Sequence, residues 1–158
     1  QREAVTQIAQ QNLKAIGMDV TLEYIPAQQF FADDGTVYHR LGDVMEFAWV
    51  GDVDPGGYEL MHSSQIPSED NNFSGQNIPG WKNAKNDQLI KQAVNSISDK
   101  EREPAYAEQQ SIWSQEVPQI ALFVRPNISA AKVGLSNFRP ANTNTPETWN
   151  AQEWFLKK

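Results

Sequence analysis

The sequence predicts a single α/β domain over residues 1–158, with a mixed and partly parallel sheet flanked by helices. Three observations support this prediction. Apolar and polar residues alternate at 19–25, as they do in half-buried strands, and Ile120, Leu122 and Val124 recur at every second position of a further predicted strand. An apolar run interrupted only by Glu46 occupies 44–50 and is typical of a buried strand. Stretches with apolar residues at three- and four-residue spacing lie around these segments and predict helices.

The composition is that of a folded, acidic protein. Of its 158 residues, 39% are hydrophobic and 10% aromatic, which is enough for a substantial core. The net charge of -7 and the scattered Lys and Arg residues argue against nucleic-acid binding. The absence of cysteine excludes disulfides, thiolate metal sites and cysteine nucleophiles. No membrane-spanning run or signal peptide is visible, and the start at Gln1 rather than Met suggests that an upstream segment has been removed.

The first part of the chain predicts a helix and then a strand–helix–strand unit. An amphipathic helix over 1–16 should end before Gly17, because glycine is common just beyond helix ends. A strand over 19–25 ends at a proline, which can open a short helix over 27–33. With the strand at 44–50, this spacing predicts a right-handed crossover between parallel strands.

The middle of the chain predicts a long loop. After a turn of helix at 57–62, residues 63–86 are dominated by Ser, Asn, Gly, Pro and Gln, with a few aromatic anchors such as Phe73 and Trp81. Loops of this length in a compact domain are usually functional.

Two helices and two strands are predicted after the loop. The first helix covers 87–97, and the second begins at Ser98, with Glu101 expected to complete a capping box. Pro104 predicts a kink or a later start in the second helix. The two strands are predicted at 120–124 and 128–133.

The candidate site is the stretch from Trp49 to Pro55, Trp-Val-Gly-Asp-Val-Asp-Pro. It follows a predicted strand and becomes a turn from Gly51 on, and in open α/β sheets ligands bind where strands open into loops. An ammonium group removed from water needs a charged acceptor, so Asp52 beside the aromatic face of Trp49 would suit a cationic ligand group. In the alternative interpretation, Asp52 and Asp54 only shape the turn by accepting backbone hydrogen bonds.

Other kinds of site are poorly supported. The stretch begins like a calcium loop, but the twelfth position counted from Asp52 is Ser63 rather than an acidic residue. His39 and His62 lie far apart and lack metal-ligand spacing. Neither a nucleophile elbow nor a phosphate-binding glycine loop is present. We therefore expect no catalytic residue, no metal site and no cofactor.

Five motifs follow one another along nearly the whole chain. They are Ala9-Gln-Gln-Asn-Leu-Lys-Ala-Ile-Gly-Met-Asp-Val-Thr-Leu; the Trp49-to-Pro55 stretch; Asn77-Ile-Pro-Gly-Trp81-Lys-Asn83 followed by Asp87-Gln-Leu-Ile; Arg102, Tyr106 and Gln110 with Glu116, Pro118 and Ile120; and an ending with Trp149 and Trp154. In this order they resemble the last segment of family 5 extracellular solute-binding proteins. These are the dipeptide- and oligopeptide-binding components of ABC importers.

The resemblance implies that the chain is the C-terminal lobe, or part of it, of a longer two-lobed protein with a periplasmic-binding-protein-like fold. Such proteins are not enzymes; they enclose di- or oligopeptides between their lobes and deliver them to a permease. In the family, the Asp at the position of Asp52 pairs with the α-amino group of the ligand, and the Trp at the position of Trp49 lies nearby. The residues expected to bind ligand are Trp49, Gly51, Asp52, Asp54 and Trp81. The loop is one residue shorter before Asp54 than the family pattern.

The resemblance also implies partners and a location. The partners are a peptide ligand, the N-terminal lobe of the same chain and ABC permease subunits, without nucleic acid. The location is extracytoplasmic, either in the periplasm or lipid-anchored on the outer face of the cytoplasmic membrane. The family also includes binders of nickel complexes and oligosaccharides, and an interaction domain without a transport role would equally explain the loop aromatics. The sequence leaves these alternatives open.

Overall fold

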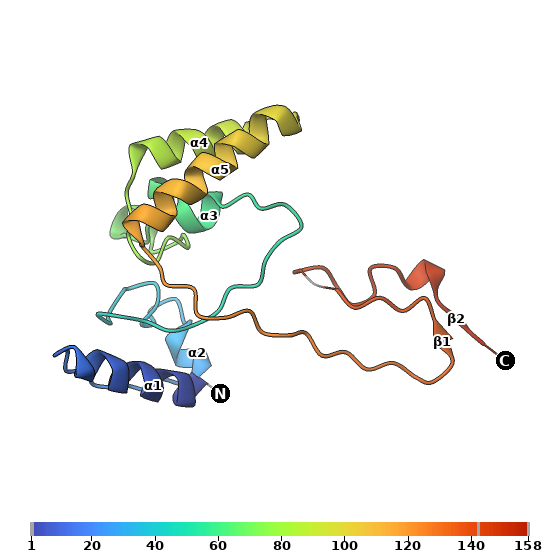
Figure 1. Cartoon of the computed structure of the whole chain (residues 1–158), viewed down its shortest axis with the longest axis horizontal. Helices are drawn as coiled ribbons and strands as arrows, with labels where there is room; N and C mark the ends of the chain where they lie inside the picture. The colour runs from blue at the N-terminus through green and yellow to red at the C-terminus, as the bar shows by residue number, and fades with distance from the viewer. Residues whose placement is uncertain (1, 142, 158) are drawn as a thin grey trace. The chain divides into compact units, whose positions relative to one another are not determined.

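The computed structural model describes residues 2–141 and 143–157. It consists mainly of helices, extended segments and turns (Figure 1). The elements are α1 (Arg2–Ala15), α2 (Ala27–Phe30), α3 (Tyr58–Met61), η1 (Ser63–Gln65), η2 (Glu69–Asn71), α4 (Ala84–Asn95), α5 (Asp99–Glu116), β1 (Leu135–Ser136), η3 (Ala151–Glu153) and β2 (Phe155–Leu156). No helix within the described ranges is long and apolar enough to cross a lipid bilayer.

The chain divides into two compact units, each formed by two separate stretches. The first unit comprises Gln1–Ala48 and Tyr58–Asp87, and the second comprises Trp49–Gly57 and Gln88–Lys158. The candidate loop is therefore grouped with the C-terminal half of the chain rather than with the residues on either side of it.

In the first unit, α1 confirms the predicted N-terminal helix and the way it ends. Gly17 has φ +89, and its N–H donates to the carbonyl of Lys14 at 3.0 Å. The N–H of Met18 donates to the carbonyl of Leu13, also at 3.0 Å. These two bonds form a Schellman motif, which satisfies the last carbonyls of a helix and favours glycine at the left-handed position.

An aromatic cluster follows α2. Phe30, Phe31 and Phe47 contact one another edge to face, with ring centroids 5.0–6.0 Å apart. The helix is shorter than the predicted 27–33 and is followed by a tight turn, in which the N–H of Gly35 donates to the carbonyl of Ala32 at 2.8 Å. A Cβ at position 35 would overlap the carbonyl oxygen of Gln29, so the turn has room only for glycine.

The predicted loop 63–86 is ordered by side-chain hydrogen bonds as well as by the short helices η1 and η2. Asn86 is fully buried, and its Nδ2 donates to the carbonyl of Met61 at 2.9 Å. The carboxylate of Asp87 accepts hydrogen bonds from both the N–H and the Oγ of Ser63. The first turn of α4 thus holds the segment that connects α3 to η1.

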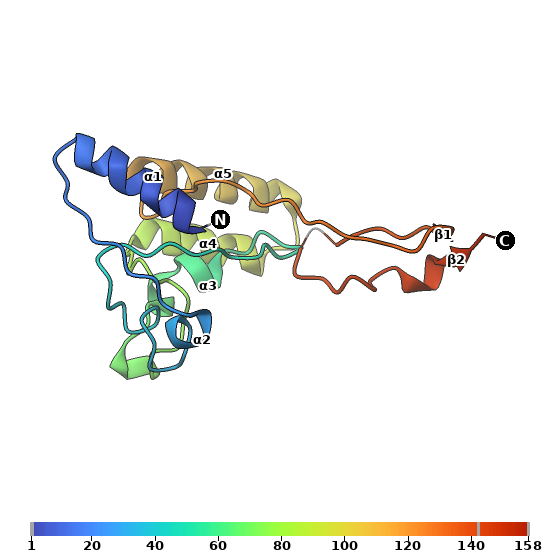
Figure 2. The same ribbon diagram turned by 90° about the horizontal axis from the view of Figure 1, so that it is seen from below.

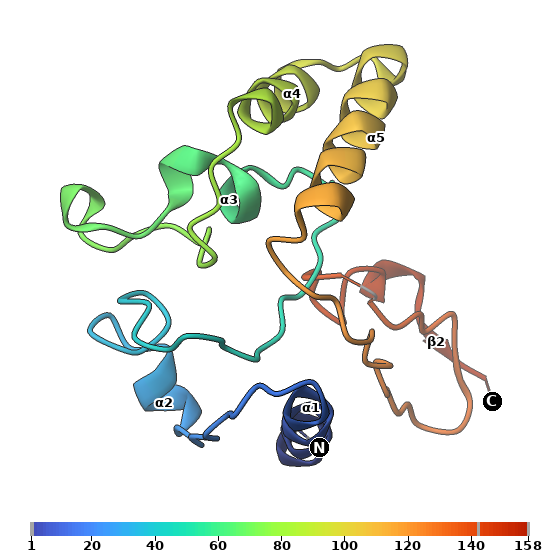
Figure 3. The ribbon, with the colours of Figure 1, turned by 60° about the vertical axis from the view of Figure 1, so that its left-hand side comes forward.

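In the second unit, α4 and α5 lie side by side (Figure 3). Their contact is a small core of three buried residues, with two larger side chains packed against it. The buried residues are Leu89, Ala93 and Ala105, and the packed side chains are Tyr106 and Ile112. The helix predicted for 87–97 is therefore confirmed in part: Leu89 and Ala93 of its apolar face are in the core, but α4 ends at Asn95 and Ile97 is fully exposed. The helix begins earlier than predicted because the Oδ1 of Asn83 caps it by accepting from the N–H groups of Lys85 and Asn86 at 3.0 Å.

The start of α5 differs from the predicted capping box. Ser98 is the N-cap residue but makes no side-chain capping bond. The Oγ of Ser96 instead donates to the carboxylate of Glu101 at 2.6 Å and accepts from the N–H of Ser98 at 3.1 Å. Pro104 lies inside a helix that is continuous from Asp99, so the predicted later start is wrong.

The predicted mixed, partly parallel sheet is not formed in the described part of the chain. The sheet found there has two antiparallel strands, with Leu135 opposite Leu156 and Ser136 opposite Phe155. None of the four segments predicted as strands is paired in a ladder; they are 19–25, 44–50, 120–124 and 128–133. The predicted parallel crossover, which depends on two of them, is therefore also wrong. Alternation of apolar residues indicates an extended chain, but a sheet also needs a neighbouring strand, and no periodicity within one segment shows where that neighbour lies.

The segment 119–132 runs as an extended chain between α5 and β1 (Figure 2). Most of its apolar side chains are in solvent: Val124 is 95% exposed and Ile128 92% exposed. The segment is tied to the chain beyond β1 by the Nδ2 of Asn127, which donates to the carbonyl of Ala141 at 3.2 Å. Exposed apolar side chains along an unpaired, extended backbone are what a buried strand looks like without its neighbours.

The C-terminal tail is anchored by two tryptophans. The Nε1 of Trp149 donates to the carbonyl of Arg139 at 3.0 Å, and that of Trp154 donates to the Oδ1 of Asn150 at 2.9 Å. The ring of Trp154 also contacts Phe138 edge to face. These contacts fold the tail back towards β1.

Candidate functional site

The candidate loop Trp49–Gly57 lies in the second unit and is held in place at both ends. At its start, the carbonyl of Gly51 accepts a hydrogen bond from the N–H of Asn144 at 2.9 Å. Near its end, the carboxylate of Asp54 is bound by groups from α5. Because both ends are held, the residues between them have little freedom to move independently.

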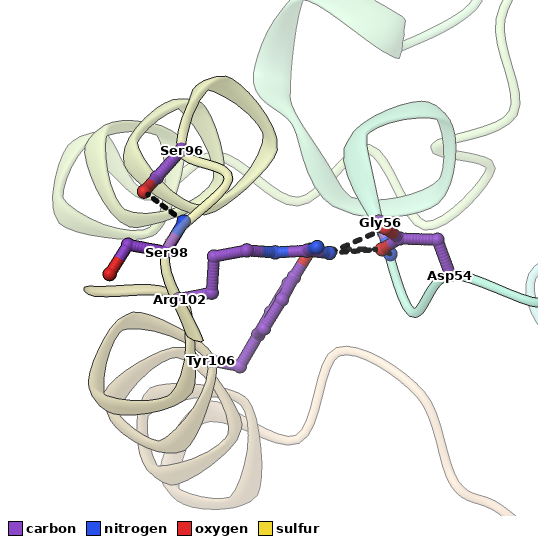
Figure 4. A network of polar contacts seen from close by, with 6 residues as sticks. All are labelled: Asp54, Gly56, Ser96, Ser98, Arg102 and Tyr106. Atoms are coloured by element: carbon purple, nitrogen blue, oxygen red, sulfur yellow. Dashed lines mark hydrogen bonds and ion pairs between the residues drawn. The ribbon is translucent and has the colours of Figure 1, made fainter. Parts of the chain in front are cut away.

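The contacts of Asp54 form the centre of this arrangement (Figure 4). The Nη2 of Arg102 donates to both carboxylate oxygens, at 2.6 and 2.5 Å. The phenol of Tyr106 donates to the Oδ1 at 3.4 Å, and the N–H of Gly56 donates to the same oxygen at 3.1 Å. The guanidinium of Arg102 also lies 5.7 Å from the ring centroid of Tyr106, so the three side chains form one cluster.

The charges of this cluster reinforce one another. The hydrogen bond from Gly56 and the guanidinium of Arg102 lower the pKa of Asp54. The hydrogen bonds of Arg102 with Tyr106 and Asp54 raise the pKa of the guanidinium. Both groups are therefore ionised at neutral pH, and Asp54 shapes the turn as the alternative interpretation describes.

Asp52 is in a different situation from Asp54. Its side chain is exposed, and none of the described residues forms a hydrogen bond or an ion pair with its carboxylate. Trp49, three residues earlier, is 37% exposed. Of the two carboxylates in the loop, Asp52 is thus the one available to an incoming cation.

A shallow cavity of about 320 Å³ opens between the loop and α5. Its lining comes from three loop residues and four α5 residues: Val53, Asp54, Pro55, Asp99, Arg102, Glu103 and Tyr106. The ion pair of Asp54 and Arg102 is part of this lining, and Asp99 and Glu103 add two further carboxylates, so the lining carries a net negative charge.

Trp81, the remaining predicted site residue, belongs to the first unit. Its backbone N–H donates to the Oδ1 of Asn77 at 3.2 Å, and its carbonyl accepts from the Nδ2 of Asn77 at 2.9 Å. The same Nδ2 donates to the carbonyl of His62 at 3.1 Å. Asn77 is 1% exposed, so Trp81 is held by a buried amide.

A second shallow cavity, of about 350 Å³, lies beside η1 and η2 in the first unit. It is lined by mainly polar residues: Ser63, Ser64, Ile66, Ser68, Asp70, Asn71 and Lys82. It includes none of the residues that the sequence predicted to bind ligand.

The two histidines have local structural contacts. His39 stacks on Phe73 with ring centroids 3.8 Å apart, and the Nδ1 of His62 lies 2.8 Å from the Oγ of Ser64. Within residues 2–141 and 143–157, no group of three or more His, Cys, Asp or Glu side chains is arranged to hold a metal ion.

Sequence reasoning did not identify the residues that hold the loop. Arg102 and Tyr106 are one helical turn apart and so share a face of α5, a spacing that is visible in the sequence. What the sequence does not show is that this face meets Asp54, 48 and 52 residues earlier. Asn144 has no sequence signal at all, because it contributes only its backbone N–H.

Comparison with known proteins gives no match to a family model, but two proteins are similar over almost the whole chain. The oligopeptide-binding protein AppA of Bacillus subtilis (strain 168) is 28% identical over 159 residues, covering 99% of this chain and 27% of that protein. The crystal structure of an oligopeptide-binding protein from Thermus thermophilus, complexed with a pentapeptide, matches with a TM-score of 0.80 and 30% identity. That match covers 98% of this chain and 28% of the other.

Both similarities agree with the family resemblance that the five motifs indicate. The chain spans about a quarter of the length of either protein. It has part of the oligopeptide-binding protein fold, with its helices and a small antiparallel sheet present among the described residues. Over almost its whole length the chain is therefore similar to a part of two oligopeptide-binding proteins.

Proposed function

We propose that this chain is a ligand-binding part of the substrate-binding component of an ABC-type peptide importer. Such a component captures di- or oligopeptides between two lobes and delivers them to a permease in the membrane. In this proposal residues 1–158 belong to one C-terminal lobe, the remaining lobe comes from a longer form of the same chain, and the protein works outside the cytoplasm.

One observation carries the proposal. Asp52 is an exposed carboxylate in a loop that is held on both sides, and Trp49 lies three residues before it. A chain similar over 98% of this length binds a pentapeptide in its crystal structure. A carboxylate and an indole in one loop would together suit a peptide's α-ammonium group, because the carboxylate pairs with the charge and an aromatic face excludes water.

The experiment is calorimetry on the full-length protein with di-, tri- and pentapeptides and with their N-acetylated forms. We expect Asp52→Asn to weaken the binding of free-amine peptides at least about thirtyfold, since losing one partner of a desolvated charge pair costs about 2 kcal/mol or more of binding free energy. The N-acetylated peptides should bind weakly to both proteins. Asp43→Asn, which removes another exposed carboxylate, is the matched control and should bind like the wild type.

Peptide binding that is indifferent to both Asp52 and the free amine would overturn the assignment of Asp52. A protein that binds no peptide but does bind an oligosaccharide or a nickel complex would keep the family and replace the cargo.

A further inference from the structure

We propose that Arg102 and Tyr106 are positioning residues for the ligand loop. By holding the carboxylate of Asp54, they fix the direction in which Asp52 presents its own carboxylate. The inference deepens the proposed function and rests on it, because Asp52 is a ligand residue only there.

The carboxylate of Asp54 is bound from two sides. A single guanidinium nitrogen of Arg102 bridges both oxygens of Asp54, and the phenol of Tyr106 donates to one of them (Figure 4). The N–H of Gly56 donates to that same oxygen from within the loop. The carboxylate is therefore held from outside the loop and from inside it, and charge-assisted bonds of this kind are the stronger class of hydrogen bond.

Asp52 lies between two residues that are each hydrogen-bonded to another part of the chain. Gly51, directly before it, is bound through its carbonyl to the N–H of Asn144. Asp54, two residues after it, is bound to α5. Consecutive Cα atoms are about 3.8 Å apart, so only Asp52 and Val53 lie between the two fixed positions and their backbone has few alternatives.

Helix α5, which carries Arg102 and Tyr106, is itself packed in place. Arg102 and Tyr106 are separated by one turn of α5, and Ala105 beside them is buried in the core shared with α4. An anchor on a packed helix restrains a loop better than an anchor on another loop, because the helix itself does not move independently.

A plain surface ion pair is the competing explanation. Arg102 and Asp54 have side chains that are 23% and 58% exposed, and such pairs contribute little to stability. The two explanations differ in what they predict for binding. A plain ion pair leaves the affinity for peptide unchanged when it is removed, whereas a positioning pair weakens it through Asp52.

The test is a double-mutant cycle between Arg102 and Asp52 in the full-length protein, with calorimetry on a free-amine tripeptide. We expect Arg102→Gln to weaken peptide binding about tenfold. Without Arg102 the loop becomes ordered only when the peptide binds, and the entropy lost in ordering it reduces the affinity. In an Asp52→Asn background, Arg102→Gln should lower the affinity for the peptide by less than about twofold, because the carboxylate that Arg102 positions is absent. Lys100→Gln removes a neighbouring exposed positive charge from α5 and should leave the affinity unchanged in both backgrounds.

Two further measurements keep the test decisive. Tyr106→Phe removes only the phenol hydroxyl and should show the same dependence on Asp52 with a smaller loss, even if Arg102→Gln impairs folding. Backbone amides of 51–57 should exchange faster with deuterium in Arg102→Gln than in Lys100→Gln.

The outcomes separate the two proposals. If Asp52→Asn weakens binding but Arg102→Gln and Tyr106→Phe do not, or if their effects simply add to it, the positioning role is overturned and the proposed function stands. If Asp52→Asn has no effect on peptide binding, the assignment of Asp52 as a ligand residue is overturned and the positioning role falls with it.

Discussion

The side chain of Asn77 forms two hydrogen bonds with the backbone of Trp81, donating one and accepting the other. Its Oδ1 accepts from the N–H of Trp81 at 3.2 Å, and its Nδ2 donates to the carbonyl of the same residue at 2.9 Å. A third bond runs from the Nδ2 to the carbonyl of His62. A single buried amide thus organises the part of the long loop that carries a predicted ligand residue.

Replacing this amide should destabilise the fold. Asn77→Ala leaves the N–H and carbonyl of Trp81 and the carbonyl of His62 without their partner, and we expect a loss of about 1–3 kcal/mol in the free energy of unfolding. Urea denaturation followed by tryptophan fluorescence measures this change. The exposed Asn95 provides the control, since Asn95→Ala should stay within about 0.5 kcal/mol of the wild type. Equal stability of the two variants would contradict the role of the Asn77 amide.

Gly75 occupies a position that should not tolerate a side chain. Its φ is +115, and a Cβ there would overlap the carbonyl oxygen of Gln65. Gly75→Ala should therefore reduce the free energy of unfolding by at least about 1 kcal/mol, through backbone strain and the steric overlap. Gly51→Ala is the matched control, because a Cβ at that position meets nothing within 4 Å. Thermal unfolding of both variants compares them, and an unchanged Gly75→Ala protein would show that the loop can rearrange.

The ion pair between Asp54 and Arg102 predicts an acid-sensitive loop. Because the folded-state pKa of Asp54 is lowered, its contribution to stability is fully present above the ordinary aspartate pKa of about 3.9 and is lost as the pH falls through the lowered value. We therefore expect Asp54→Asn to melt below the wild type at pH 7. The difference in melting temperature should shrink as the pH falls through the lowered pKa of Asp54 and its carboxylate becomes protonated. A difference in melting temperature that persists unchanged at acidic pH would mean that the carboxylate charge does not matter.

The 158-residue chain by itself should bind short peptides weakly or not at all. A binding site enclosed by two lobes removes the ligand from water on both sides, whereas Asp52 in this chain is exposed, and a solvated ion pair contributes about 1 kcal/mol at most. Calorimetry with a peptide series checks this. A dissociation constant below about 10 micromolar would require about -7 kcal/mol from this part of the site and would refute the expectation.

Local sequence signals were reliable where the structure they describe is local. The end of α1 at Gly17 and the start of α5 after Ser98 both depend on neighbours within a few residues. The capping box failed because Ser96, two residues before the N-cap, competes for Glu101. The Oγ of Ser96 takes both the carboxylate of Glu101 and the N–H of Ser98, the two groups that a capping box would pair with each other.

The sheet was predicted wrongly for a different reason. Residues 44–50 and 120–124 have the composition of buried strands, but pairing is a property of two segments, and no segment's own periodicity specifies its neighbour. The described chain contains a ladder only between β1 and β2, and Val124 remains exposed.

The amino-acid sequence by itself determined the main helices, the turn at Gly51 to Pro55 and, through the order of its motifs, the resemblance to oligopeptide-binding proteins. Hydrogen bonds over a few residues and helical periodicity are sufficient for the helices and the turn. Only the tertiary structure decided that the two carboxylates of the loop differ. Asp54 is bound by Arg102 and Tyr106 from α5, while Asp52 stays exposed. Two aspartates two residues apart carry the same local signal, and what separates them is a helix that folding brings to one and not to the other.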